Sequence, residues 1–292
     1  MSLSTPTFQD VLRAATHRLS EAGFESPRLD AEVLLRYLLD VDRTGLFLHL
    51  PDPASPHISG ALDELISRRL TGEPVAYIVG QREFMGLPFH VGPGVLVPRP
   101  ETELLVEWAL DWLKRHPNAS VIDVGSGSGA IALSIAALLP INSAVKVLAS
   151  DLSQEALTIA HHNRDALSDH GIVGKVHFIE QSLLDQTTGP LDLVLANLPY
   201  LTSEQIVGNP DLEDEPRLAL DGGKDGLDLV RALIGDLRRV LAPHGAAGFE
   251  LDPAQTGTVE RLLAAEFPHA VVRTIDDLAG LSRHVVLRHS ED

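Results

Sequence analysis

A glycine-rich turn between an apolar strand and an apolar helix is the first place in the sequence where chemistry could occur. The strand Val121–Val124 leads into Gly125-Ser126-Gly127-Ser128-Gly129, and an apolar run begins at Ala130. Glycines at such a position let the chain turn sharply and let a ligand approach the backbone closely. By itself the turn predicts either a nucleotide site or a tight turn that binds nothing.

Asp151 favours the first interpretation. It lies 22 residues after Gly129, just beyond the next apolar strand, Val145–Ala149. In a sheet whose strands alternate with helices, a carboxylate there can accept hydrogen bonds from both ribose hydroxyls of a nucleoside. The alternative is that Asp151 caps the helix that begins at Ser153, and one side chain can do both.

The spacing of the turn narrows the class of cofactor. Dinucleotide sites ordinarily have G-x-G-x-x-G, whereas this turn is G-x-G-x-G with Asp123 two residues before the first glycine. That variant resembles the first motif of methyltransferases that use S-adenosylmethionine. The resemblance implies this cofactor, with Asp123 near its methionine end and Gly125 to Gly129 beneath it.

A second constellation, Asn197-Leu198-Pro199-Tyr200, follows the apolar strand Leu191–Ala196, at the strand end where α/β sheets bind ligands. An amide or aromatic amine nitrogen is a weak nucleophile. Two acceptors, the Asn197 side-chain oxygen and the Leu198 carbonyl, could hold its hydrogens and aim its lone pair at a methyl group. Pro199 and the Tyr200 ring would shape the slot, and we expect Asn197 to border the cofactor too. The alternative is an ordinary turn.

Over nearly its whole length the chain resembles the release factor glutamine N5-methyltransferases (the PrmC/HemK family). The further segments that carry the resemblance are Arg28–Glu32, Gly72–Ile78, Glu83–Phe89, Leu96–Glu103 and Leu220–Leu227. Of these, Pro98–Glu103 and Asp221–Leu227 are more discriminating than the glycine turn, which many methyltransferase families share. The resemblance implies methyl transfer to the side-chain amide nitrogen of the glutamine in the Gly-Gly-Gln motif of peptide chain release factors.

The sequence departs from the family pattern in two places. The family usually has Asn-Pro-Pro-Tyr, and Leu198 replaces the first proline; the backbone carbonyl that the chemistry needs is kept, while the restriction on Asn197 is lost. The family often has an acidic or aromatic residue against the adenine, where this chain has Gln181-Ser182-Leu183-Leu184. We therefore expect Leu183 or Leu184 to hold the adenine by apolar contact.

The resemblance implies three parts: a helical substrate-recognition domain at residues 1–74, a β-hairpin connector at 75–100, and a class I, Rossmann-like methyltransferase domain at 101–292. Apolar periodicity predicts helices over Phe8–Leu19, Pro27–Leu38 and Ile58–Leu70, and β-forming residues predict a hairpin of Ala76–Val79 with Glu83–Val91. From Glu101 onward strands alternate with helices, which predicts a mostly parallel, doubly wound α/β sheet. The expected strands are Ser120–Val124, Val145–Ala149, Lys175–Ile179, Leu191–Ala196, Ala246–Leu251, Ala270–Ile275 and His284–Leu287.

Charge and composition limit the partners. Lysine and arginine number 23 against 41 acidic residues, a net charge of −18, and bare phosphate backbones repel such a chain. A protein partner is therefore favoured over DNA or naked RNA, although the charge could serve solubility alone. The chain has no cysteine, no apolar run long enough for a membrane span and no secretion signal at its N-terminus. We expect a cytoplasmic monomer that binds no membrane.

Three other features have ordinary explanations. Adjacent residues on a helix point about 100° apart, so His161-His162 does not predict a metal site and no metal is expected. The acidic run Asp211–Glu215 reads as a solvated loop, with a docking site for a basic partner as the alternative. Arg99 and Glu101 could form a lid over the substrate, or an ion pair that only stabilises the fold.

The sequence leaves two other functions open. One is methylation of nucleic-acid amino groups (adenine N6 or guanine N2), because those enzymes share an Asn-Pro-Pro-Tyr-like loop; the charge of −18 disfavours it. The other is a catalytically silent binding module, which the intact Asn197–Tyr200 motif disfavours.

Overall fold

The computed structural model describes residues 5–207, 212 and 214–289. Asp211 and Glu213 of the acidic run lie outside these ranges, as do residues 1–4. The chain divides into two compact units, one of residues 1–80 with 208–214 and one of residues 81–207 with 215–292. Within the described ranges, none of the helices combines the length and the apolarity needed to cross a bilayer.

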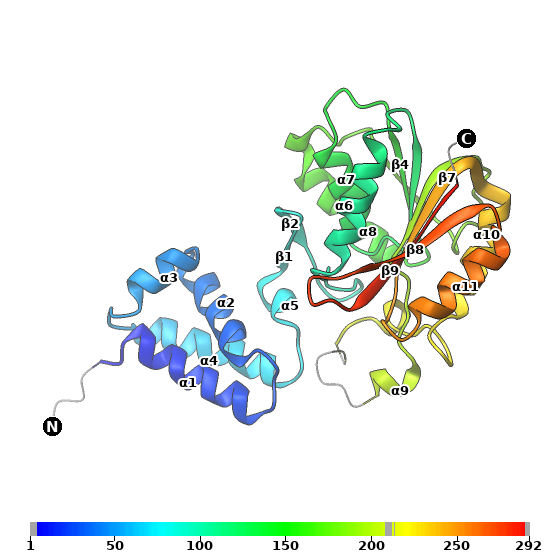
Figure 1. The fold of residues 1–292 in the computed structure, drawn as a ribbon. Coiled ribbons are helices and arrows are strands. Elements are labelled where there is room, and N and C mark those ends of the chain that lie inside the picture. Colours follow the sequence, from blue (N-terminus) through cyan, green and yellow to red (C-terminus); the bar gives the residue numbers. More distant parts are fainter. Residues whose placement is uncertain (1–4, 208–211, 213, 290–292) are drawn as a thin grey trace. The chain divides into compact units, whose positions relative to one another are not determined.

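The first unit is helical, as predicted (Figure 1). Its helices are α1 (Phe8–Glu21), α2 (Pro27–Leu39), α3 (Arg43–His49), α4 (Pro56–Leu70) and α5 (Val75–Val79). The caps follow from the sequence: Thr7 forms a capping box with Asp10, and Ser55 accepts from the backbone N–H of Ile58 before a first-turn proline. Inside this unit the half-buried Arg28–Glu32 motif contributes Asp30, which pairs with buried Arg69 at 2.8 Å.

The predicted strand Ala76–Val79 is wrong, because these residues form α5. The valine, tyrosine and isoleucine of this segment are β-formers, but Pro74 opens a helical turn and Gly80 ends it with a positive φ of 74°. Three consecutive residues, Ala76 to Ile78, are buried, which a strand with one solvated face would not allow. The hairpin is shorter than predicted: β1 (Gln81–Phe84) pairs with β2 (Leu87–His90) around the turn Met85-Gly86.

The second unit is the predicted doubly wound α/β sheet. Its strands are β3 (Ser120–Val124), β4 (Lys146–Asp151), β5 (Val176–Glu180), β6 (Leu191–Ala196), β7 (Leu241–Glu250), β8 (Ala270–Asp276) and β9 (Ser282–His289). They are ordered β5-β4-β3-β6-β7-β9-β8. The pairs among β3 to β7 are parallel, and β9 runs antiparallel to both β7 and β8. The prediction of a mostly parallel sheet is therefore confirmed.

Helices cover both faces of this sheet (Figure 1). They are α6 (Thr102–Leu113), α7 (Ala130–Leu138), α8 (Gln154–Ala166), α10 (Asp228–Val240) and α11 (Thr256–Glu266), while the short helix α9 (Ser203–Ile206) has no buried residue. On β6, Leu193 and Leu195 join the core under α6 and α7, while Val194 and Ala196 join the core under α10 and α11. Both faces of the central strands are therefore buried, which is why these strands read as continuous apolar runs.

The β1–β2 hairpin belongs to the core of the second unit. Phe84, Leu87 and Phe89 are buried in the same cluster as α6 and α7, with the two phenylalanine rings edge to face at 6.0 Å. The backbone N–H and C=O of His90 are both bonded to the side chain of Asn163 on α8. The hairpin is thus fixed to the sheet domain by apolar packing and by a buried amide.

Candidate active site

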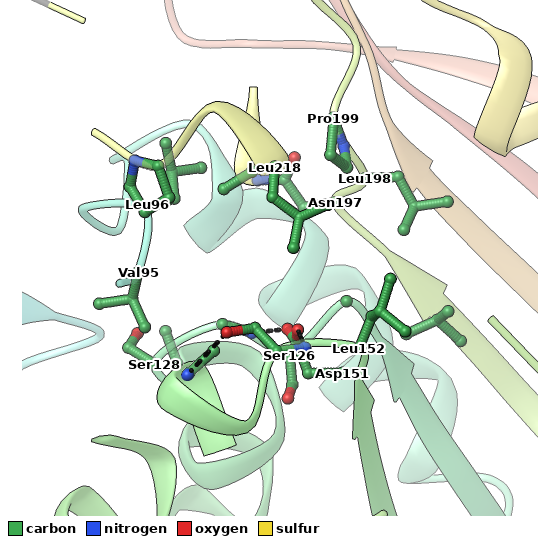
Figure 2. A pocket seen from close by; sticks show the side chains of 18 of the residues that line it. Val95, Leu96, Ser126, Ser128, Asp151, Leu152, Asn197, Leu198, Pro199 and Leu218 are labelled. Atoms are coloured by element: carbon green, nitrogen blue, oxygen red, sulfur yellow. Dashed lines mark hydrogen bonds between the residues drawn. The ribbon is translucent and has the colours of Figure 1, made fainter. Parts of the chain in front are cut away.

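A pocket of about 280 Å³ lies at the carboxyl ends of β3, β4 and β6. Figure 2 shows Ser126 and Asp151 on one side of it and Asn197 and Pro199 on the opposite side. Two further segments contribute to the wall, Gly94–Arg99 before α6 and Pro216–Ala219, which follows the loop Asn197–Tyr200, hereafter the reacting loop. The volume is near the lower end of the roughly 300–1,000 Å³ usual for small-molecule sites.

The glycine turn is built for close approach of a ligand. Gly125, Gly127 and Gly129 all have positive φ, at 74°, 54° and 81°. The backbone N–H groups of Gly125 and Ser126 both donate to the Ser150 carbonyl on β4, at 2.8 and 2.9 Å. A Cβ placed on Gly127 would meet open space, whereas one on Gly125 would lie 2.9 Å from the side chain of Leu198. The turn therefore leaves room on its pocket side and packs against the reacting loop.

Asp151 is bonded to the backbone on both sides and is not itself the N-cap of α8. Its Oδ1 accepts from the backbone N–H of Ser153 at the start of α8, and its Oδ2 accepts from the N–H of Gly127, each at 2.8 Å. Ser153 itself is the N-cap of α8, since its hydroxyl accepts from the N–H of Ala156. The carboxylate also lines the pocket. Asp151 thus ties the glycine turn to the start of α8 and contributes to the pocket wall.

Asp123 lies behind the turn, fully buried. Its Oδ2 accepts from the N–H of Ala132 in the first turn of α7, at 3.2 Å, and among the described residues Oδ1 has no hydrogen-bond partner. Burial raises the pKa of this carboxyl to about 7, against the hydrogen bond from Ala132, with the charge of Asp151 adding to the rise. Ser126 also has a buried hydroxyl oxygen without a described partner. Ser126 lines the pocket, whereas Asp123, which the sequence predicted at the cofactor, is not among the lining residues.

The two leucines expected to hold the adenine are in different positions. Leu183 lines the pocket and has a positive φ of 44°, while Leu184 is fully buried in the core under α10. The side chain of Gln181 is engaged internally with Thr187 and with the backbone N–H of Gln186. Leu152, which the sequence did not single out, lines the pocket beside Asp151 and is 56% exposed. The signal that could have identified Leu152 in the sequence is an apolar residue directly after Asp151.

The reacting loop presents Asn197 to the pocket. The Asn197 Nδ2 donates to the hydroxyl of Thr102, the first residue of α6, at 3.1 Å. Leu198 and Pro199 also line the pocket, and the Leu198 side chain is 5% exposed. Tyr200 is not among the lining residues, and burial raises the pKa of its hydroxyl far above the ordinary value. In this structure, then, Asn197, Leu198 and Pro199 border the pocket, and the expected contribution of the Tyr200 ring to its wall is not observed.

The supports behind this loop were missed by the sequence argument. Gln255 Nε2 donates to the backbone carbonyls of Tyr200 and Asp225, at 2.8 and 3.0 Å. A Cβ on Gly226 would lie 2.0 Å from the backbone carbonyl oxygen of Tyr200, and one on Gly222 would lie 2.5 Å from the backbone carbonyl oxygen of Pro199. The glycines of the Asp221–Leu227 segment were therefore a visible signal for close packing, but Gln255 gave none.

The flanking segments are joined by one buried carboxylate. Glu215 is 5% exposed; it pairs with Arg99 and accepts from the N–H of Val97 at 2.9 Å. Arg99 is thus part of an ion pair that fastens the two segments of the pocket wall together. Glu215 is also the last residue of the acidic run, so that part of the run is buried rather than solvated.

The adjacent histidines diverge. The His162 ring packs against the His90 ring with their centroids 4.9 Å apart, and the His161 ring packs against the Phe178 ring with their centroids 4.8 Å apart. Over the ranges that the structure describes, no group of three histidine or acidic side chains could hold a metal ion.

The strand order, the glycine turn with its acidic residue on the next strand, and the pocket between them define a class I methyltransferase fold. A 16S rRNA N2 methyltransferase from T. thermophilus, solved with AdoMet and guanosine, has this fold. It matches with a TM-score of 0.51 at 16% identity, over 72% of this chain and 50% of that one.

Sequence comparison identifies the family. Residues 10–80 match the PrmC N-terminal domain, and residues 101–210 match the methyltransferase small domain. The release factor glutamine methyltransferases of Moorella thermoacetica and Deinococcus radiodurans are each 38% identical, over 95% and 97% of this chain and 96% and 98% of their own lengths. The chain belongs to the release factor glutamine methyltransferase family.

Proposed function

We propose that this enzyme transfers a methyl group from S-adenosylmethionine to the side-chain amide nitrogen of the glutamine in the Gly-Gly-Gln motif of a peptide chain release factor. The observation that carries the proposal is the position of Asn197. Its carboxamide borders a pocket whose opposite wall is the glycine turn with Asp151. A carboxamide there can recognise another amide.

The residues present fit the cofactor. Asp151 offers a carboxylate for ribose hydroxyls, and Leu152 with Leu183 offers apolar contact for adenine. The open space beside Gly127 leaves room for the polar methionine end. When bound, S-adenosylmethionine supplies an electrophilic methyl group on a sulfonium.

The chain's own residues then act by positioning. Asn197 Oδ1 and the Leu198 carbonyl each accept one hydrogen of the substrate amide, which fixes the plane of that amide and the direction of its nitrogen. Pro199 lines the slot around it. Gln255 holds the Tyr200 carbonyl, so the loop is preorganised before the substrate arrives.

We assign substrate recognition and methyl transfer to different segments of the chain. Every residue that lines the pocket lies between Gly94 and Leu229, so we assign recognition of the protein substrate to residues 1–74, with residues 75–100 as the connector and residues 101–292 as the methyltransferase domain. The net charge of −18 supports a protein substrate over nucleic acid. Release factors work on ribosomes, so we place the reaction in the cytoplasm, with the enzyme acting as a monomer.

The test is a competition among substrates. Purified enzyme and tritiated S-adenosylmethionine would be incubated with a release factor, ribosomal RNA or DNA in parallel. We expect incorporation into the release factor alone, and a release factor whose glutamine is replaced by alanine should accept nothing. Incorporation into RNA or DNA instead would refute the proposal.

A further inference from the structure

Thr102 and Asn197 are 95 positions apart in the sequence, yet both line the pocket and their polar groups meet. The Asn197 Nδ2 donates to Thr102 Oγ1 at 3.1 Å, and Thr102 is only 3% exposed. This contact joins the first residue of α6 to the loop that follows β6.

The two ends of a carboxamide have opposite hydrogen-bonding character. Its oxygen accepts hydrogen bonds and its NH₂ donates them, and rotation by 180° exchanges the two ends. The proposed reaction needs the oxygen toward the substrate, because the substrate amide offers hydrogens there. An Asn197 side chain turned the other way would oppose NH₂ to NH₂ and hold nothing.

The support for this orientation is rigid. The Thr102 backbone N–H donates to the Arg99 carbonyl at 3.1 Å, and Arg99 is paired with buried Glu215. In the same helix Leu105 and Val106 are fully buried against the sheet, so α6 cannot rotate freely. The hydroxyl oxygen therefore has a fixed position, and in the observed contact it accepts from the Asn197 NH₂ group.

We propose that Thr102 is a positioning residue: its hydroxyl engages the Asn197 NH₂ group and so keeps Asn197 Oδ1 turned to the substrate amide. This role rests on the proposed function, but the hydrogen bond itself does not. Thr102 acts through Asn197.

The matched variants are Thr102→Val, which removes the hydroxyl at nearly constant shape, and Thr102→Ser, which keeps it. We expect Thr102→Val to lower the turnover number about 5- to 20-fold, the effect of losing one buried hydrogen bond. The KM for release factor and the calorimetric Kd for S-adenosylmethionine should stay within about twofold, because losing one hydrogen bond of a preorganised site acts on turnover rather than on binding. Thr102→Ser should restore most of the turnover.

Thr256→Val is the control. Thr256 is likewise the first residue of a helix, 5% exposed, and its hydroxyl donates to the Pro253 carbonyl rather than to the reacting loop. It should lose stability as Thr102→Val does, without losing turnover. In an Asn197→Ala background, Thr102→Val should cause no further loss, because the group it orients is absent.

A readout without substrate separates this inference from the proposed function. The NMR signal of the Asn197 NH₂ group, identified by its disappearance in Asn197→Ala, should shift in Thr102→Val and stay in place in Thr102→Ser. Normal turnover in Thr102→Val, or an equal loss in the Asn197→Ala background, would overturn the inference. If wild-type enzyme failed to methylate release factor, the proposed function would fall, and an unmoved NMR signal would overturn the Thr102 contact independently.

Discussion

The glycine turn and the reacting loop face the same pocket, but different parts of the chain hold them. The turn is fixed by contacts within a short stretch, from Asp123 through the Ser150 carbonyl to Asp151. The loop Asn197–Tyr200 depends on Thr102 and Gln255, which lie 95 and 55 positions away from their partners.

This difference teaches that the two sides should fail separately. Damage to the turn should weaken cofactor binding and leave the geometry of the substrate amide intact. Damage to the loop or its supports should stop transfer while cofactor still binds. Each of the following variants tests whether the two sides are separable.

Asn197→Ala should have the largest effect. Removing a preorganised polar contact in a desolvated site typically costs about 10²–10³-fold in turnover, and the Kd for S-adenosylmethionine should change little. Single-turnover assays with tritiated cofactor measure the first quantity and calorimetry the second. Asn197→Asp should also fail, because its buried charge opposes the neutral amide geometry. Near-normal transfer by Asn197→Ala would mean that this loop does not hold the nucleophile.

Gly226→Ala should have the second largest effect on transfer, because its added methyl group would push against the backbone of the reacting loop. Its Cβ would lie 2.0 Å from the Tyr200 oxygen, and its φ is 73°. A displacement of about 1 Å at the reacting centre can cost roughly 10²-fold in rate. The control is Gly174→Ala, which has a φ of 83° and open space around its Cβ. Both variants should lose stability from backbone strain, and only Gly226→Ala should lose transfer; equal kinetics in the two would contradict the support role.

Asp151→Ala tests the other side of the pocket. We expect the affinity for S-adenosylmethionine to fall by roughly 1.5–3 kcal/mol, the scale for losing hydrogen bonds to a charged group. Helix α8 should still form, because Ser153 remains its N-cap. Asp151→Asn keeps an oxygen for the Gly127 N–H and should lose less. An unchanged Kd in Asp151→Ala would exclude this carboxylate from the cofactor site.

We expect the raised pKa of Asp123 to make the stability of the enzyme depend on pH. Its carboxyl ionises near 3.8 when unfolded and near 7 when folded, so between these values the folded chain holds a proton that the unfolded chain has released. This contribution to stability therefore falls as the pH rises from about 4 to about 7, and the penalty is complete above pH 7. Asp123→Asn should become more stable relative to wild type by about 1–3 kcal/mol between pH 5 and pH 8. Urea denaturation at several pH values measures this, and parallel curves would contradict the buried carboxyl's raised pKa.

Leu198→Pro should have the smallest effect. It restores the residue common in the family and keeps the backbone carbonyl, so turnover should stay within about threefold of wild type, far from the roughly 10²-fold loss of a misplaced group. The variant should lose about 1–2 kcal/mol of stability, because the buried leucine side chain that packs on Gly125 is shortened. A large loss of turnover at normal stability would show that more than the carbonyl of this residue is needed.

The contrast between the glycine turn and the reacting loop also explains which parts of the site could be predicted from the sequence. The strand–turn–helix from Ser120 to Leu138 and the acidic residue on the next strand form a local pattern, and the expected β3 and β6 match the observed bounds. Gln255 could not be found this way, because its role comes from β7 ending beside the reacting loop. The same holds for Thr102, whose hydroxyl has meaning only once α6 packs beside β6.

The short helices were not predicted from the sequence, for a different reason. The segment Ala76–Val79 has strand composition, but Pro74 and Gly80 bracket a single helical turn. The helix Arg43–His49 went unnoticed although Asp42 caps it by accepting from the Gly45 N–H at 2.7 Å. In such short pieces the caps decide the structure, whereas apolar periodicity needs several turns to be visible.

The most direct test of the central claim is the location of the methyl group. A release factor would be incubated with enzyme and S-adenosylmethionine, digested, and sequenced by tandem mass spectrometry, with Asn197→Ala enzyme in parallel. The account predicts one added methyl group on the side-chain amide of the Gly-Gly-Gln glutamine with wild-type enzyme, and an unmodified peptide with the variant. A methyl group on any other residue, or equal modification by both enzymes, would contradict it.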